Sequence, residues 1–434
     1  MSKGTGSRSN GDIRPNGVDF DKFLRFKLPR RYGGFNWWQG QFACPISILA
    51  FGFLLCAFLT PCPAYGSSSV DSYVESVFQL LEKHREALPR LIVPANATAE
   101  ALMRGGAFYL AGDKGWVAEA DGRAGGPVMI RPIPASEPPN KGDVVWIGYF
   151  PESYVEEAQR AKELEDRGCL VVAFGPKLAG GAPHFTHWID SFTPPTGDDN
   201  FARMGNIISL WTLTAEVAAS VSRQGKTLTF SQSGSIEGAN ERNALYRGLA
   251  FHDGVPQMAP IQPGVLSRAY LAYVQKMLQN IQESELAKIV MVGQEMSRSA
   301  AEGHPAVLMV LGHMMPYAVD RNSRFFSYLD LRTARKDVES QLHQGGHFVF
   351  IAYVGIYLDL WRQVRRAGAT AAWIVSPLPT EVHFAQFGDV VIDEHWPIGD
   401  CAVEVPGYDI RILPPSAIAQ LFIYEMLLRA AGAH

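Results

Sequence analysis

The segment KGDVVWIGYFPESYVEEAQRAKELEDRGCLVVAFGP at 141–176 decides the fold. It begins with a Gly-led apolar run, which is followed by a stretch with Val155, Ala158 and Leu164 on one helical face. Gly168 ends that stretch, and a second apolar run, CLVVAFG, follows. A buried strand, an amphipathic helix and a second buried strand are typical of a mostly parallel sheet with helices on both faces.

The same pattern returns about 200 residues later, in QGGHFVFIAYVGIYLDLWRQVRRAGATAAWIVSP at 344–377, where Gly368 takes the place of the earlier helix-ending glycine. HWID at 187–190 and DVVID at 389–393 then correspond in order and type. A period of this length is too long for a solenoid repeat and predicts a duplicated domain.

The length of 434 residues suits two domains plus appendages. We predict a leader over 1–66, a first α/β domain over 67–225, a linker over 226–263 and a second α/β domain over 264–434. The linker is assigned because that stretch is rich in Gly, Ser, Asn and Pro and shows no clear periodicity.

The composition is that of a soluble globular protein, with 47% hydrophobic and 19% charged residues. A formal charge of −4 gives no basic surplus for nucleic-acid binding. AGDKGWVAE is not a dinucleotide-binding fingerprint, and the histidines of HFTH lack a third nearby ligand, so neither a cofactor nor a metal is predicted. Cys169 and Cys401 are expected to remain unbridged.

The leader contains a basic patch and then the apolar run PISILAFGFLLCAFLT at 45–60. This run has about the length of a signal-peptide core and is short for a spanning helix of roughly 20 residues. Ala64 and Gly66 precede a plausible cut before Ser67. We predict an export signal and hence a periplasmic or secreted protein. The alternatives are an uncleaved membrane anchor through 45–60, or a wrongly assigned start codon on a cytoplasmic protein.

Several short motifs together resemble two tandem sugar isomerase (SIS) domains, the α/β fold of phosphosugar isomerases and phosphosugar-binding regulators. The resemblance covers about 70–225 and 264–434 and is divided between the halves. The first half carries Ala118-Glu119 and Arg123-Ala124-Gly125-Gly126. The second carries Gly312-His313, Gly399-Asp400, Val403-Glu404 and Pro406-Gly407, with Ser416 in place of the family's Ser/Thr loop before the final helix.

One departure concerns the Ser/Thr-rich turn with which the family wraps a phosphate after the third strand. In this chain the two corresponding turns begin with Tyr149-Phe150-Pro151 and Ala352-Tyr353. Glu152 would repel a phosphate in the first turn, and Tyr353 is the hydroxyl offered by the second. This departure counts against a standard phosphosugar site in both halves.

The candidate catalytic residues are Glu404, His313 and Asp400, and the candidate ligand-binding residues are Gly112, Lys114, Glu119, Arg123, Gly312 and Ser416. Asp400 and Glu404 can supply the base and its orienting partner for an aldose–ketose isomerisation, or they can cap a turn and pair with Arg411. His313 follows a strand, where α/β sheets place ligands, or it is a buried histidine bonded to a backbone carbonyl. Lys114 is alternatively an ordinary surface lysine.

Three hypotheses on function follow. The first is an exported protein that binds a sugar or sugar-phosphate derivative between its halves, with weak or no catalysis. The second is a non-catalytic structural or interaction protein, and the third is a cytoplasmic sugar-phosphate isomerase. The apolar C-terminal helix, with Ile418, Phe422 and Met426, is expected either between the halves or in a subunit interface of a homo-oligomer.

Overall fold

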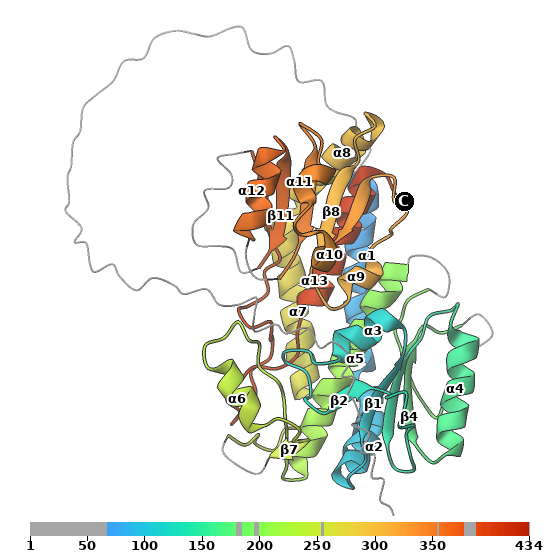
Figure 1. Cartoon of the computed structure of the whole chain (residues 1–434). Helices are drawn as coiled ribbons and strands as arrows, with labels where there is room; N and C mark the ends of the chain where they lie inside the picture. Colours follow the sequence, from blue (N-terminus) through green and yellow to red (C-terminus); the bar gives the residue numbers. More distant parts are fainter. Residues whose placement is uncertain are drawn as a thin grey trace, which may run out of the picture. The chain divides into compact units, whose positions relative to one another are not determined.

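A computed structural model of the chain describes residues 67–178, 185–194, 199–252, 256–353, 356–376 and 388–433. The predicted export signal or anchor at 45–60 and the histidine at 184 lie outside these described residues. Residues 63–434 form one compact unit, which contains two parallel sheets (Figure 1).

The first half begins with helices and continues as a parallel α/β sheet. Its elements are α1 (Ser67–Ala87), a short 3-10 helix (Leu88–Leu91), α2 (Ile92–Met103), β1 (Phe108–Gly112), α3 (Lys114–Ala120), β2 (Ile130–Pro132), β3 (Val144–Gly148), α4 (Tyr154–Asp166), β4 (Leu170–Gly175), β5 (His187–Asp190) and α5 (Asp199–Arg223). The strands lie in the order β2-β1-β3-β4-β5.

A connection joins the halves through β6 (Thr227–Leu228), α6 (Ala239–Leu245) and β7 (Phe251–His252). The second half contains α7 (Val265–Ser284), α8 (Leu286–Ala301), β8 (Ala306–Val310), α9 (Met315–Ala318), β9 (Phe326–Asp330), α10 (Leu331–Ala334), α11 (Val338–Gln341), β10 (His347–Ile351), α12 (Leu358–Arg366), β11 (Thr370–Val375), β12 (Val390–Asp393) and α13 (Ser416–Ala431). Its strand order is β9-β8-β10-β11-β12.

The two sheets have the same strand order. When the strands of each sheet are counted along the chain, they lie side by side in the order second, first, third, fourth, fifth. In each half the three central strands are apolar and buried, as in VVWIG of β3 and HFVFI of β10. Residues paired across β1 and β3 run from Phe108 and Val144 to Gly112 and Gly148. The α/β class and the parallel sheets flanked by helices therefore confirm the predicted fold class.

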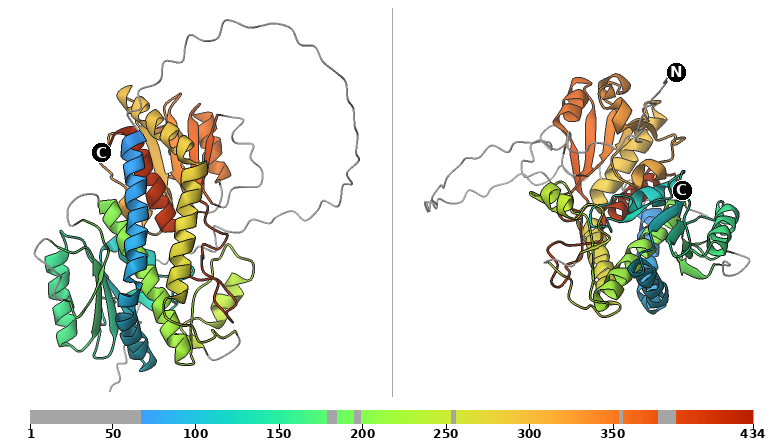
Figure 2. Two further views of the ribbon diagram at one scale, coloured as in Figure 1. Left: turned by 180° about the vertical axis from the view of Figure 1, so that it is seen from behind. Right: turned by 60° about the horizontal axis from the view of Figure 1, so that its bottom comes forward.

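Long helices from both halves pack together between the sheets (Figure 2). α13 contacts α8, α7, α5 and α1, and almost every one of its residues is buried. One hydrophobic core extends through both halves and includes Trp146 of β3, Trp211 of α5 and Phe422 of α13. The C-terminal helix thus lies inside the chain, between elements of the two halves.

The segment 226–263 does more than link the halves. β6 and β7 pair antiparallel, and Leu228 and Phe230 are fully buried. Phe230 also forms a bridge with Pro127, which ties the segment to the first half. A two-residue strand gives no readable periodicity, and this is why the sequence indicated only a linker.

Cys169 and Cys401 are both buried and unbridged. In the part of the chain that the structure describes, no helix is long and apolar enough to cross a membrane.

Candidate functional site

The carboxyl ends of the second sheet's strands face the first half of the chain. Gly312 and His313 follow β8, Tyr353 follows β10, and Trp396 follows β12. His313 Nδ1 lies 3.0 Å from the Ala118 carbonyl oxygen of α3. Ligands of open α/β sheets bind outside the carboxyl ends of the strands, so this edge is where a site is expected.

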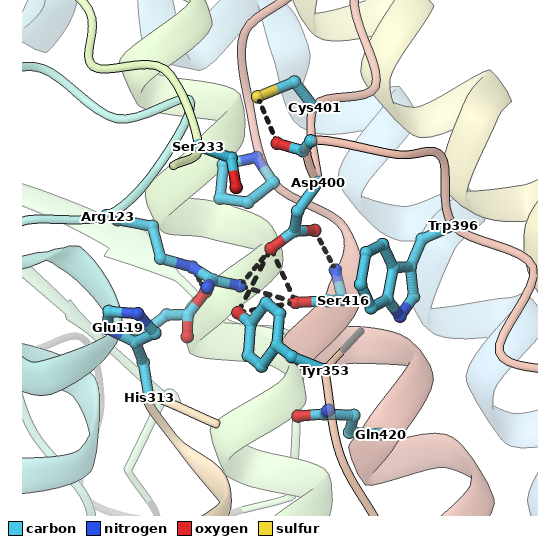
Figure 3. Close-up of polar contacts among 12 residues, drawn as sticks. Glu119, Arg123, Ser233, His313, Tyr353, Trp396, Asp400, Cys401, Ser416 and Gln420 are labelled. Atoms are coloured by element: carbon cyan, nitrogen blue, oxygen red, sulfur yellow. Dashed lines mark hydrogen bonds and ion pairs between the residues drawn. The ribbon is translucent and has the colours of Figure 1, made fainter. Parts of the chain in front are cut away.

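A buried network of charged side chains, formed by Glu119, Arg123 and Asp400, lies between this edge and the first half. Arg123 Nε donates to Glu119 Oε1 at 3.1 Å, and Arg123 Nη2 lies 2.8 Å from Asp400 Oδ2 (Figure 3). The three side chains are exposed by only 1%, 0% and 2%. Arg123 comes from the first half and Asp400 from the second, so the network joins the halves.

Two hydroxyl groups complete the network. Arg123 Nη2 donates to Ser416 Oγ at 2.5 Å, and Ser416 Oγ donates to Asp400 Oδ2 at 2.9 Å. The Tyr353 hydroxyl donates to Asp400 Oδ2 at 3.1 Å, and its ring lies 5.1 Å from the Arg123 guanidinium. Ser416 N, at the start of α13, donates to Asp400 Oδ1 at 3.1 Å. The carboxylate therefore also stabilises the helix N-terminus.

The loop before α13 holds Asp400 in an unusual backbone conformation. Asp400 has φ 51° and Leu413 has φ 67°, values that non-glycine residues rarely adopt. The Leu413 amide donates to the Gly125 carbonyl at 2.9 Å. A Cβ on Gly125, whose φ is 74°, would lie 2.7 Å from Cys401 Sγ. Strain of this kind concentrates at functional sites, and here the two motif segments, 118–126 and 399–416, lie against each other.

Burial controls the electrostatics of the network. It raises the pKa of Glu119 to about 7, although the neighbouring Arg123 opposes the shift. Burial also raises the pKa of Asp400, again against Arg123. Burial alone would lower the pKa of Arg123, but Asp400 and Glu119 raise it, so the guanidinium stays charged. Glu119 is therefore poised to exchange a proton near neutral pH.

A second buried carboxyl group lies at the same edge. Glu394 follows β12, is fully buried and receives the Trp396 indole N–H on Oε2. Burial raises the pKa of Glu394 well above its ordinary value. Glu394 Oε1 and Glu119 Oε2 have no hydrogen-bond partner among the described residues.

The structure brings together Glu119, Arg123, His313, Asp400 and Ser416. Gly312 lies with them, because a Cβ there would come within 2.6 Å of Gln420 Oε1 of α13. In the structure the segments 118–126 and 399–416 thus contact each other.

Gly112, Lys114 and Glu404 lie elsewhere. Gly112 ends β1, and a Cβ on it would meet Gly148 O at 1.9 Å, so its role is close strand packing. Lys114 begins α3 at the edge of the first sheet and is exposed.

Glu404 is not the base of this cluster. Val403 pairs with Ile412 in a β-bridge, so Val403 and Val405 point inward and Glu404 points to solvent. Its carboxylate is 85% exposed and lies 3.7 Å from Arg411, the salt bridge that was the alternative interpretation.

Sequence reasoning did not single out Glu394, Trp396 or Ser231. Ser231 Oγ donates to the Arg123 carbonyl at 2.6 Å, although this serine lies in the segment assigned as a linker. Glu394 directly follows a predicted strand, and its position at a strand's carboxyl end was the signal that would have found it.

The turns that follow β3 and β10 contain aromatic residues. After β3, Tyr149 and Phe150 are buried, and the Tyr149 hydroxyl donates to the Pro176 carbonyl at 2.9 Å.

A cavity of about 110 Å³ in the first half lies away from the ion network and is lined by His84, Asp190 and Trp188, among others. No group of three or more potential metal ligands occurs among the residues that the structure describes.

Comparison by sequence finds no matching protein-family model and no matching curated protein. Comparison with solved structures finds the C-terminal domain of glucosamine-fructose-6-phosphate aminotransferase from Francisella tularensis at 10% identity, with 81% of this chain and 96% of that chain covered and a TM-score of 0.44. A candidate sugar-binding protein from Salmonella typhimurium LT2 matches at 10% identity, 83% and 98% coverage and a TM-score of 0.48.

A candidate phosphosugar isomerase from Silicibacter pomeroyi matches at 10% identity, 82% and 97% coverage and a TM-score of 0.43. Each match is a likeness in fold and assigns this chain no activity.

Proposed function

We propose that the protein binds a sugar derivative at the carboxyl edge of the second sheet, where the halves meet. The observation that carries this proposal is the convergence of Glu119 and Arg123 from the first half with His313, Asp400 and Ser416 from the second. These residues belong to the motifs that resemble the SIS family. A ligand approaches along Gly312, His313 and Tyr353, which are partly exposed.

Weak isomerase chemistry at this edge would use Glu119. An aldose–ketose isomerisation needs a base for the proton next to the carbonyl, and a base works best when its pKa lies near the working pH. Burial places the pKa of Glu119 at about 7. His313 is positioned through Ala118, the residue before Glu119, so both groups lie at the same end of α3.

The test is a calorimetric titration of the purified full chain with sugars and sugar phosphates up to millimolar concentration. Binding heat is expected for at least one of them, and His313→Ala should weaken it at least tenfold. His343→Ala is the matched control, because His343 is exposed and precedes β10 at the opposite edge of the sheet. Absence of any heat or thermal shift with every ligand would contradict sugar binding.

Export remains part of this proposal. The predicted cut falls directly before Ser67, and α1 begins at Ser67, so cleavage there would leave the described fold whole. Mass spectrometry of the mature protein from its native host should find Ser67 at the N-terminus. An intact leader on protein recovered from the cytoplasmic fraction would contradict export.

A non-catalytic structural role is the second candidate. It is favoured because Arg123, Asp400 and Ser416 are buried and already bonded to one another. Under this alternative the network stabilises the junction of the halves, and substitutions in it change stability without affecting the binding of any sugar.

A further inference from the structure

The carboxyl edge of the second sheet presents hydrogen-bond acceptors that lack donors. Glu119 Oε2 and Glu394 Oε1 are both buried without a hydrogen-bond partner among the described residues. Burying a polar atom without a partner destabilises a folded protein, so such atoms call for an explanation. Glu119 is linked to Asp400 through Arg123. Glu394 accepts from Trp396, whose ring lies 5.4 Å from the ring of Tyr353, and Tyr353 donates to Asp400.

The Arg123 cation is fully engaged. Arg123 contacts two carboxylates and the Ser416 hydroxyl at 3.1, 2.8 and 2.5 Å. The residues that directly follow β8, β10, β11 and β12 in the described chain include neither Lys nor Arg.

The first sheet differs at the corresponding edge. Lys114 follows β1, Lys177 follows β4, and Arg203 of α5 lies 3.8 Å from Asp113 and 5.0 Å from the Phe150 ring. Lys114, Lys177 and Arg203 thus lie at the edge of the first sheet. The further cations near Cys401 are Arg242 and Arg411, and they are paired with Asp409 and Glu404.

The chemistry of donors and acceptors then restricts the ligand. A phosphate accepts hydrogen bonds and carries negative charge, so the Asp400 carboxylate, and Glu119 once it is ionised, repel it. Sugar hydroxyl and ammonium groups donate, and they suit carboxyl oxygens. The rings of Tyr353 and Trp396, 5.4 Å apart, add apolar surface beside these acceptors.

We propose that the site at the second sheet takes a sugar without a phosphate group, whose hydroxyl or ammonium groups donate to Glu119 and Glu394. This inference rests on the proposed sugar-binding function and narrows its ligand class. It runs against the phosphosugar ligands that the family resemblance implies, and it agrees with an exported protein.

The experiment compares matched ligand pairs on the full chain: glucose with glucose 6-phosphate, fructose with fructose 6-phosphate, and glucosamine with glucosamine 6-phosphate. We expect each bound sugar to have a dissociation constant at least tenfold lower than its phosphorylated counterpart. Equal or tighter binding of the phosphorylated members would overturn the inference and leave sugar binding intact. If no member of any pair binds, the proposed function fails and this inference falls with it.

Variants locate the bound sugar. Glu119→Gln replaces a carboxyl acceptor by an amide that also donates. It should weaken the binding of the unphosphorylated sugar and reduce the preference over its phosphorylated counterpart below threefold. Glu394→Gln serves as the second test if Glu119→Gln does not fold, as judged by circular dichroism. Arg203→Ala is the control at the first sheet and should leave the preference unchanged. Loss of all binding in Arg203→Ala would place the ligand at the first sheet and contradict the inference.

Discussion

Replacing Arg123 by methionine removes the cation between two buried carboxyl groups and is the sharpest perturbation of the ion network. Methionine keeps most of the side-chain volume, while Glu119 and Asp400 lose the partner at 3.1 and 2.8 Å. Breaking a buried ion pair by removing one partner typically costs about 3–5 kcal/mol. We expect Arg123→Met to lower the free energy of unfolding by about this amount at pH 8.

The loss should depend on pH in a defined direction. Glu119, whose pKa is about 7, is largely protonated at pH 5. Removing Arg123 raises the pKa values of Glu119 and Asp400 further, because the cation favours their charged forms. The folded variant therefore binds more protons than the folded wild type, and its deficit grows as the pH rises. At pH 5 we expect roughly half of the loss seen at pH 8.

Urea unfolding followed by circular dichroism at pH 5 and pH 8 measures both effects. Arg411→Met is the matched control, because it breaks the exposed pair with Glu404, whose side chains are 52% and 85% accessible. That control should change the free energy of unfolding by less than about 0.5 kcal/mol at either pH. Equal losses in the two variants, or a deficit of Arg123→Met that shrinks as the pH rises, would refute the reasoning.

Three further predictions use the same unfolding measurement. Burial raises the pKa of Glu119 from 4.5 to about 7, so its stabilising contribution is present below pH 4.5 and is lost as the pH rises to 7. Between these pH values the free energy of unfolding of Glu119→Gln should rise by about 3 kcal/mol relative to that of the wild type. A difference between the two proteins that does not change with pH would contradict this. Burial lowers the pKa of His84 from 6.5 to about 4, so its stabilising contribution is present above pH 6.5 and is lost as the pH falls to 4. Between pH 6.5 and pH 4 the free energy of unfolding of His84→Gln should fall by about 3 kcal/mol less than that of the wild type. Gly125 and Gly122 both have positive φ, but a Cβ meets atoms only at Gly125; Gly125→Ala should cost about 2 kcal/mol more than Gly122→Ala, and equal costs would refute a tight contact with Cys401.

Much of the fold was predictable from apolar runs and glycines. The runs that became β3 and β10 are buried throughout, and Gly168 and Gly368 follow α4 and α12 with φ values of 86° and 67°. Such signals are local, because a buried strand must be apolar and a left-handed helix end favours glycine.

The errors in the predicted elements also have local causes. α2 begins at Ile92 although it contains Pro94, because this proline lies in the first turn, where proline is tolerated. A sequence pattern therefore misses the start of this helix. α3 ends at Ala120, before the glycine pair at 125–126, because Asp121 takes an extended backbone conformation with ψ 120°.

The candidate site was predictable only in part. The motifs identified Glu119, Arg123, Asp400 and Ser416, but they did not show which carboxylate is buried. Glu404 and Asp400 look alike in sequence. The β-bridge between Val403 and Ile412 leaves Glu404 exposed, whereas Asp400 is buried by its contact with Arg123 from the first half. That bridge pairs residues nine positions apart across a Pro-Gly turn, and single-residue patterns do not encode it.

The central claim, that a sugar binds where the second sheet's carboxyl edge meets α3, is tested most directly by hydrogen–deuterium exchange. The full chain is measured with and without the tightest-binding member of the sugar panel. We expect the ligand to slow exchange in 117–126, 311–315 and 396–418. Slowing confined to 112–115, 149–153 and 200–206 at the first sheet's edge, with none at the second, would contradict it.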